Sequence, residues 1–209
     1  MKGGKLPVKT LKKLIQASGT YDPENDTIDD WKLDKELSNS YGQVYSNKNN
    51  NRAVVVHRQT KTTYDILDDL GLITNDKTGD RFKIAEIVQK NAENRYKPEN
   101  ITVVGYSLGG LLGPEYASDD VHEIITLNRP VLPSDIRTKP NKKHFNIKAS
   151  RDPVSILSYL QPNDPNEIKI QSTSFNPFRE HSVDVLDRLD EEQQIGHGKG
   201  RSGKCKPKK

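Results

Sequence analysis

The stretch ENITVVGYSLGGLLGPEYAS, residues 99–118, places a glycine-flanked serine between two apolar runs. The first run, ITVV, has the β-branched composition of a buried strand, and the residues from Leu108 onward are predicted to form a helix. Ser107 therefore lies on a tight turn between strand and helix, where Gly105 and Gly109 leave room for a sharply bent backbone. This context predicts a nucleophilic serine on an elbow, with the Leu108 N–H as the first oxyanion donor.

Apolar strands and helical segments alternate on both sides of this elbow. A helix over residues 80–96 carries an apolar stripe at helical spacing, residues 9–18 are predicted to form a short basic helix, and the acidic segment 26–40 is predicted to be partly helical. Further buried strands are predicted at residues 52–60, 122–130, 143–150 and 166–174. The alternation predicts an α/β fold with a mostly parallel sheet flanked by helices.

A serine nucleophile needs an orienting acid, which is expected at the carboxyl end of a parallel strand. The first strand after Ser107 ends in TLNRP and has no acid at its tip, whereas the second ends in RDP, residues 151–153. Asp152 is therefore the predicted acid, and an ordinary turn aspartate before a proline is the structural alternative. Three other acids are placed less well: Asp119, Asp120 and Asp164.

The predicted base is His181, because this histidine follows the last predicted strand, in NPFREHSVDVLDRL at residues 176–189. A loop at this place can return to Ser107, so that the imidazole takes the serine proton while Asp152 fixes its tautomer. A surface histidine near a helix start is the structural alternative. His57 competes as the base, although it precedes Ser107 and lies in the predicted oxyanion region.

Length and composition indicate one soluble domain with basic ends. The chain has 209 residues, no run of 18 apolar residues, no visible signal peptide and one cysteine, Cys205, which leaves no intrachain disulfide. These features predict a protein that is cytoplasmic or packaged in a particle. No cluster of cysteine and histidine offers a metal site, so neither a metal nor a cofactor is predicted.

The positive charge is concentrated at the two ends of the chain. Residues 1–13 hold five lysines and residues 197–209 hold six lysines and arginines; taking these eleven charges from the net +4 leaves about −7 for residues 14–196. The predicted division is a basic segment at 1–13, one domain at 14–194 and a basic, disordered tail at 195–209. The ends predict peripheral contact with an anionic membrane; without interleaved aromatic residues, specific nucleic-acid recognition is not expected.

Five short motifs occur in an order that resembles the class 3 lipases, the fungal-type triacylglycerol lipase family of α/β-hydrolases. They are VVVHRQTKTTYDILDDL, VGYSLGG, ITLNRP, SRDPVSIL and EHSVDVL, and they extend over residues 52–188. The resemblance implies a compact α/β-hydrolase-like fold and selects the same Ser107, Asp152 and His181 as catalytic residues.

The resemblance also implies roles for the end of the strand that precedes the elbow. Thr60 matches the position of the second oxyanion donor, and Arg58 matches a structural arginine. Gln59 replaces the glycine of the family, His57 replaces an aromatic residue, and Tyr106 replaces the histidine before the nucleophile. The oxyanion loop is therefore the part of the chain that departs most from the family.

The resemblance implies a serine carboxylic-ester hydrolase, a lipase or esterase that includes phospholipase chemistry, acting on acyl-ester lipids through an acyl-enzyme. An alternative is a catalytically inactive lipase-like protein that serves as a lipid-binding or structural component, because fold does not determine function. A third hypothesis is association with nucleic acid through the basic tails, which predicts salt-sensitive binding that is lost without residues 197–209.

Overall fold

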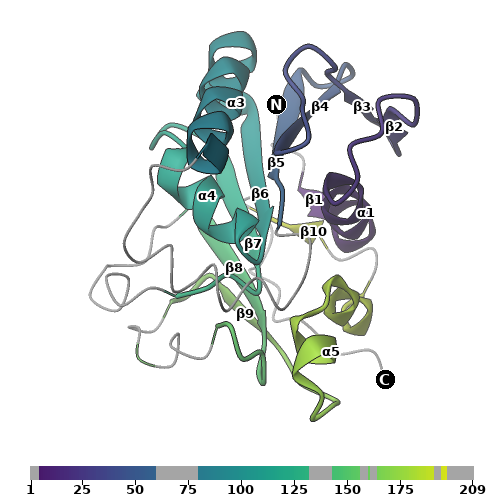
Figure 1. The fold of residues 1–209 in the computed structure, drawn as a ribbon, viewed down its shortest axis with the longest axis vertical. Helices are drawn as coiled ribbons and strands as arrows, with labels where there is room; N and C mark the ends of the chain where they lie inside the picture. The colour runs from purple at the N-terminus through teal and green to yellow at the C-terminus, as the bar shows by residue number, and fades with distance from the viewer. Residues whose placement is uncertain are drawn as a thin grey trace.

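A twisted sheet forms the centre of the molecule (Figure 1). The computed structural model describes residues 5–59, 80–131, 143–155, 160, 164–190 and 194–196. Within these ranges the main sheet has eight strands in the order β2-β3-β4-β5-β6-β7-β8-β9. Their bounds are β2 (Thr27–Ile28), β3 (Trp31–Leu33), β4 (Gly42–Asn47), β5 (Arg52–His57), β6 (Ile101–Tyr106), β7 (Glu123–Leu127), β8 (His144–Ala149) and β9 (Glu167–Ile170).

Strands β5 to β9 pair in parallel, and β2 to β5 extend the sheet in the antiparallel sense. The predicted α/β fold with a mostly parallel sheet is therefore confirmed. The antiparallel step between β4 and β5 needs only the four turn residues 48–51, where Asn51 adopts a φ of 53°. Asparagine tolerates this left-handed conformation better than most residues, which explains the polar turn at this point.

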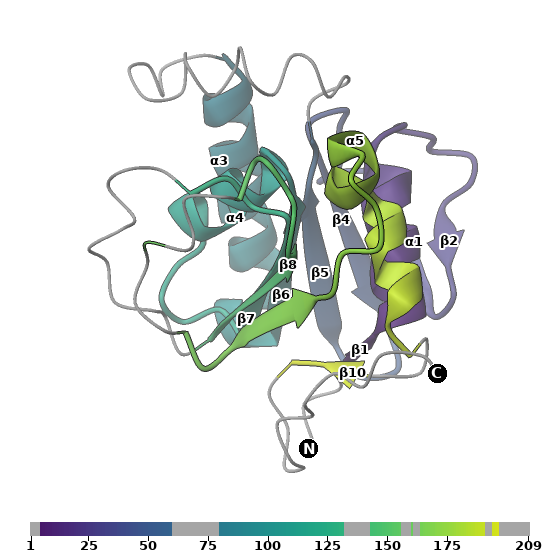
Figure 2. The same ribbon diagram turned by 90° about the horizontal axis from the view of Figure 1, so that it is seen from below.

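Helices cover both faces of the sheet (Figure 2). Helices α3 (Asp80–Tyr96) and α4 (Gly109–Tyr116) lie on one face, and α4 continues through Pro114 without ending there. Helix α1 (Val8–Ser18), the short α5 (Pro177–His181) and the 3₁₀ helix η4 (Val183–Arg188) lie on the other face. A further 3₁₀ turn, η1 (Pro98–Asn100), leads into β6.

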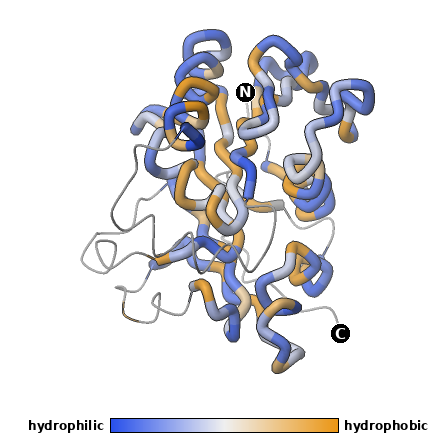
Figure 3. Tube along the Cα trace, in the orientation of Figure 1, coloured by the Kyte–Doolittle hydropathy of each residue, from blue (hydrophilic) through white to orange (hydrophobic). Residues whose placement is uncertain are grey.

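Alternate residues of the central strands enter different hydrophobic clusters. Val54 and Val56 of β5 pack with the residues of α1 and η4, whereas Ala53 and Val55 pack with those of α3. Figure 3 shows the hydrophobic segments gathered along these strands and the inner side of α1. Each fully buried valine stabilises the fold by about 1.5–3 kcal/mol, which explains why the strand reads as a continuous apolar run.

The prediction of a partly helical segment over residues 26–40 is wrong. The structure has the two short strands β2 and β3 there, joined at Asp29, whose φ is 51°. The Asp29 carboxylate accepts hydrogen bonds from Thr10 and Lys13 of α1. Pairing of β3 with β4 and this contact with α1 override the weak helical preference of the segment.

The two ends of the described chain meet beside each other. Strand β1 (Leu6–Pro7) pairs antiparallel with β10 (Gln194–Ile195), and both Leu6 and Ile195 are buried in the core. The first and last described strands therefore form one small sheet, and α1 continues directly from β1.

Candidate active site

The turn at Ser107 has the strained geometry of a nucleophile elbow. Ser107 lies between the end of β6 and the start of α4 with a φ of 54°, a value that a non-glycine residue rarely adopts. Its N–H donates to the Leu127 carbonyl at 3.0 Å, and its carbonyl accepts from the Gly110 N–H at 2.8 Å. These bonds hold the strained turn in place, and such strain is typical of functional sites.

Two glycines allow the elbow to form because backbone crosses backbone on either side of Ser107. A Cβ on Gly105 would lie 2.2 Å from the Gly109 carbonyl oxygen, and a Cβ on Gly109 would lie 2.2 Å from the His57 carbonyl oxygen. The glycines are therefore needed for contacts with each other and with β5, and helix α4 packs against the strand end without side chains between them.

Replacing Gly109 with alanine is expected to lower the free energy of unfolding by about 3 kcal/mol or more, because the new Cβ overlaps the β5 backbone. Gly113→Ala is the matched control in the same helix, since its Cβ would meet the Val103 side chain at 3.1 Å. Urea denaturation of both variants checks the prediction. Equal stability of Gly109→Ala and the wild type would contradict the backbone contact.

Three side chains from distant parts of the sequence form one hydrogen-bonded chain. The Ser107 Oγ lies 2.9 Å from His181 Nε2, and His181 Nδ1 lies 2.6 Å from Asp152 Oδ1. All three residues are buried, and Ser107 has no exposed surface. With the Nδ1 proton directed at the carboxylate, Nε2 is an acceptor for the serine proton. This arrangement can generate a serine alkoxide and stabilise the imidazolium that results.

The Asp152 carboxylate is held by its own turn. Oδ1 accepts from the Val154 N–H at 3.3 Å and Oδ2 accepts from the Ser155 N–H at 3.0 Å. Asp152 therefore makes the contacts expected of an ordinary turn aspartate, and it contacts His181 as well. The turn fixes the direction of the carboxylate, so that little conformational freedom is lost when it pairs with the imidazole.

Tyr106 and Asn128 hold the backbone around His181, a role that the sequence does not predict for them. The Tyr106 hydroxyl donates to the His181 carbonyl, and Asn128 Nδ2 donates to the Glu180 carbonyl at 3.0 Å. Asn128 Oδ1 also accepts from the Ala149 N–H at 3.0 Å, so this side chain connects β8 to α5. The position of Asn128 in the ITLNRP motif singles this residue out in the sequence, but the motif does not predict its hydrogen-bond partner.

Glu180 is a fully buried carboxylate next to His181 in the chain. Burial alone would raise its pKa, but hydrogen bonds from Arg188, Ser172 and the Ser174 N–H outweigh this effect and hold the pKa below its usual value. Arg188 binds both carboxylate oxygens, at 2.7 and 3.0 Å. This pair joins η4 to the corner that carries His181, and sequence spacing alone gives no signal for it.

The structure describes only one of the two expected oxyanion donors. Leu108 is the N-cap of α4, and its N–H makes no hydrogen bond to another backbone group within the described ranges. Thr60 lies outside the described residues. Arg58, at the start of this loop, donates from Nη1 to the Ser40 carbonyl at 2.7 Å, and its own carbonyl accepts from Arg81 at 2.6 Å.

Known proteins resemble this chain in fold and not in sequence. No family model and no curated protein sequence matches it. The Lip2 lipase of Yarrowia lipolytica superposes with a TM-score of 0.52 at 13% identity, covering 98% of this chain and 91% of that one. A triacylglycerol lipase from Penicillium expansum gives 0.53 at 17% identity and 79% coverage of both chains. A deletion mutant of the Rhizomucor miehei lipase with its propeptide gives 0.50 at 15% identity, covering 91% of this chain and 79% of that one.

The chain has the fold of the fungal lipases. At these identities the likeness concerns the fold, and it agrees with the resemblance that the five sequence motifs indicate. In this lipase fold, the described ranges contain no helix that is long and apolar enough to cross a membrane. The same ranges contain no group of three or more histidine, cysteine or acidic side chains that could hold a metal ion.

His57, the competing base, is hydrogen-bonded to α3 in this lipase fold, whereas His181 is the histidine that contacts Ser107. The His57 Nε2 lies 3.0 Å from Gln89 Oε1 of α3, and its buried Nδ1 has no hydrogen-bond partner among the described residues. Burial lowers the pKa of His57 to about 4; the hydrogen bond with Gln89 opposes this effect, and the charge of Arg81 adds to it. His57 is therefore a neutral core residue near pH 7.

The buried, neutral His57 is expected to make the folded protein less stable in mild acid. The unfolded chain takes up a proton on His57 below pH 6.5, whereas the folded chain does so only near pH 4, so the free energy of unfolding falls as the pH decreases through this window. The loss reaches about 3 kcal/mol at about 1.4 kcal/mol per pH unit. His144, whose pKa burial lowers to about 3, acts in the same direction.

Urea denaturation between pH 7 and pH 4.5 measures this effect, and a folded His57→Gln variant is expected to show a shallower dependence on pH. Stability that stays constant from pH 7 to pH 5 would show that these histidines are not buried in the neutral form.

Proposed function

We propose that this chain is a serine hydrolase of carboxylic esters, with Ser107 as the nucleophile, His181 as the general base and Asp152 as the orienting acid. The observation that supports the proposal most strongly is the unbroken hydrogen-bonded chain from Asp152 through His181 to Ser107 on a strained elbow. A buried serine in contact with a histidine that is itself oriented by a carboxylate is the arrangement that activates a serine nucleophile.

The reaction follows from this geometry. The Ser107 oxygen attacks the acyl carbonyl while its proton moves to His181 Nε2, and the Asp152 carboxylate stabilises the imidazolium. The oxyanion accepts hydrogen bonds from the Leu108 N–H and, in this proposal, from the Thr60 N–H, each worth about 10²–10³ in rate. His181 then protonates the leaving alcohol. His181 then takes a proton from water, which attacks the acyl carbonyl; the bond to Ser107 breaks, His181 returns the proton to the serine oxygen, and the carboxylic acid is released.

The proposed substrates are acyl-ester lipids, either acylglycerols or phospholipids, so the proposed activity is that of a lipase or esterase in lipid metabolism. The solved proteins with this fold include one described as a triacylglycerol lipase. A set of p-nitrophenyl esters of increasing chain length, beside phospholipid and triglyceride emulsions, identifies the preferred class.

The proposal is tested by a fluorophosphonate probe, which reacts with activated serines and stays attached. We expect one adduct on the wild-type protein, located by peptide mass spectrometry on the fragment that contains Ser107. Absence of an adduct after prolonged incubation, or an adduct elsewhere, would reject the proposed nucleophile. Absence of labelling together with intact lipid binding would instead favour the inactive lipid-binding alternative.

A further inference from the structure

The loop between β9 and α5 exposes aromatic side chains beside arginines. Phe175 is 89% exposed and Phe178 is 46% exposed, both unusually high values for phenylalanine. The guanidinium group of Arg151 lies over the ring of Phe175, 4.3 Å from its centroid, and Arg179 follows Phe178 directly. Arg151, Phe175, Phe178 and Arg179 are called the β9–α5 face below. Arg151 follows β8, Phe175 lies between β9 and α5, and Phe178 and Arg179 belong to α5. Figure 1 shows the segment between β9 and α5 at the lower end of the molecule.

The two arginines of this face differ from most other cations nearby, because neither has a carboxylate partner within the described residues. Arg188 binds Glu180 at 2.7 Å, and Lys12 binds Asp184 at 2.9 Å, so their charges are offset. Exposed phenylalanine rings next to unpaired guanidinium groups form a surface that is both apolar and positive. Such a surface complements a bilayer with anionic headgroups.

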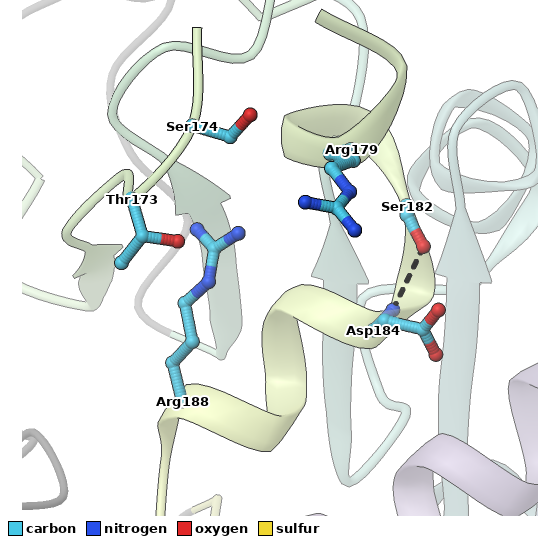
Figure 4. A pocket seen from close by; sticks show the side chains of 6 residues that line it. All are labelled: Thr173, Ser174, Arg179, Ser182, Asp184 and Arg188. Atoms are coloured by element: carbon cyan, nitrogen blue, oxygen red, sulfur yellow. Dashed lines mark hydrogen bonds between the residues drawn. The ribbon is translucent and has the colours of Figure 1, made fainter. Parts of the chain in front are cut away.

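A pocket of about 310 Å³ opens beside this face. Figure 4 shows the guanidinium groups of Arg179 and Arg188 entering it from opposite sides. Its lining residues are Thr173, Ser174, Arg179, Ser182, Asp184 and Arg188. Arg188 is already bound to Glu180, and Lys12 is shared between Asp184 and Asp187, so Arg179 and the three hydroxyls are the donors that this pocket offers to an anion. Guanidinium and hydroxyl donors of this kind recognise phosphate oxygens.

The face also lies close to the proposed reaction centre along the chain. Phe178 is three residues before His181, about one turn away on the same short helix. Docking of this face on a bilayer would therefore bring the corner that carries His181 to the lipid surface. Glu180, paired with Arg188, connects the pocket wall to the same corner.

We propose that the β9–α5 face docks this protein on anionic phospholipid bilayers. Phe175 and Phe178 enter the interfacial region, Arg151 and Arg179 contact headgroups, and the pocket beside Arg179 holds one headgroup phosphate. The biological use of this docking rests on the proposed hydrolysis of lipid esters, but the binding itself needs no catalysis. The basic termini are the competing route to the membrane, and the experiment separates the two.

Vesicle co-sedimentation of the Ser107→Ala protein tests the proposal without lipid hydrolysis. Vesicles contain phosphatidylcholine alone or in equal parts with phosphatidylglycerol. We expect tighter binding to the anionic vesicles, and Phe175→Ser/Phe178→Ser is expected to weaken it by at least about tenfold. Arg179→Gln is expected to weaken only the binding to anionic vesicles, by about fivefold.

Ile87→Ser is the matched control, because Ile87 of α3 is 56% exposed and lies outside the face. This variant is expected to bind as the parent does, and circular dichroism verifies that each variant is folded. Equal losses from Ile87→Ser and from the double variant would overturn the proposal, since any exposed apolar side chain would then suffice.

Two further arms exclude the competing sources of binding. Deleting residues 197–209 is expected to leave the dependence on Phe175 and Phe178 in place; loss of binding on this deletion, with none in the double variant, would assign docking to the tail. Millimolar inorganic phosphate is expected not to release the protein from vesicles, and full release would show that the pocket takes a free anion instead.

Ester hydrolysis by the same variants tests the proposed function independently of the docking face. The double variant is expected to retain hydrolysis of a soluble short-chain ester, because neither phenylalanine belongs to the hydrogen-bonded chain of Asp152, His181 and Ser107. Vesicle binding without hydrolysis of any ester would reject the hydrolase and retain the docking face. Hydrolysis with binding that is indifferent to the double substitution would reject the face and retain the hydrolase.

Discussion

Ser107→Ala is expected to lower kcat/KM for a short p-nitrophenyl ester by roughly 10⁴- to 10⁶-fold without unfolding the protein. The substitution removes only the Oγ that lies 2.9 Å from His181 Nε2. Alanine, like serine, has to adopt the φ of 54° at this position, so the backbone strain is unchanged. Without this oxygen no acyl-enzyme forms, and the remaining rate comes from binding and the oxyanion donors alone. Steady-state kinetics and thermal unfolding of both proteins measure the two parts of the prediction.

Ser18→Ala is the matched control for Ser107→Ala. Ser18 is also buried, but its hydroxyl donates to the Ile15 carbonyl at the end of α1, far from the elbow in sequence and in contacts. Its loss is expected to cost stability of about 1 kcal/mol and to leave kcat/KM within about twofold. If Ser107→Ala retains the wild-type rate, the proposed nucleophile is wrong, whatever the position of His181.

Asp152→Asn is expected to lower kcat by about 10⁴-fold while the protein stays folded. The carboxylate lies 2.6 Å from His181 Nδ1 and keeps the other ring nitrogen free to accept the serine proton. An amide group that donates to Nδ1 selects the opposite tautomer, so Nε2 carries a proton and cannot serve as the base. An amide oxygen in the same place lacks the charge that stabilises the imidazolium.

Asp164→Asn is the matched control, because Asp164 is another loop acid whose oxygen accepts a backbone N–H, that of Asn166 at 2.9 Å. We expect its activity to be close to that of the wild type. Kinetics at several pH values, with circular dichroism of each variant, distinguish the two aspartates. Similar rates for both variants would show that Asp152 acts only as a turn residue.

The sequence alone was sufficient to predict the positions of the three proposed catalytic side chains. Parallel strands end at one edge of a sheet, so a serine after one strand and an aspartate after a later one are brought to the same edge. Ser107 and Asp152 follow β6 and β8, and His181 comes after β9, the last strand of the main sheet. The hydrophobic period and the order of the strands along the chain can be read from one sequence, and together they indicate that the three side chains meet at one sheet edge.

The sequence was less informative where tertiary pairing decides the structure. Residues 26–40 have an acidic composition that suits a helix, but pairing of β3 with β2 and β4 places Thr27–Ile28 and Trp31–Leu33 in the sheet. The polarity of His57 suggested a base, but its place beneath α4 and its contact with Gln89 make it a core residue. In both cases the deciding partner lies on another element, which local propensity does not record.

Hydrophobic spacing and turn residues alone predict the alternation of strands and helices, the elbow at Ser107 and the sheet edge where Asp152 and His181 are expected. The contacts that hold His181, through Tyr106, Asn128 and the Glu180–Arg188 pair, form only in the folded chain. Period and turn chemistry act over a few residues, whereas the Asn128–Glu180 contact joins residues 52 apart, and its geometry exists only after the sheet and its helices have packed.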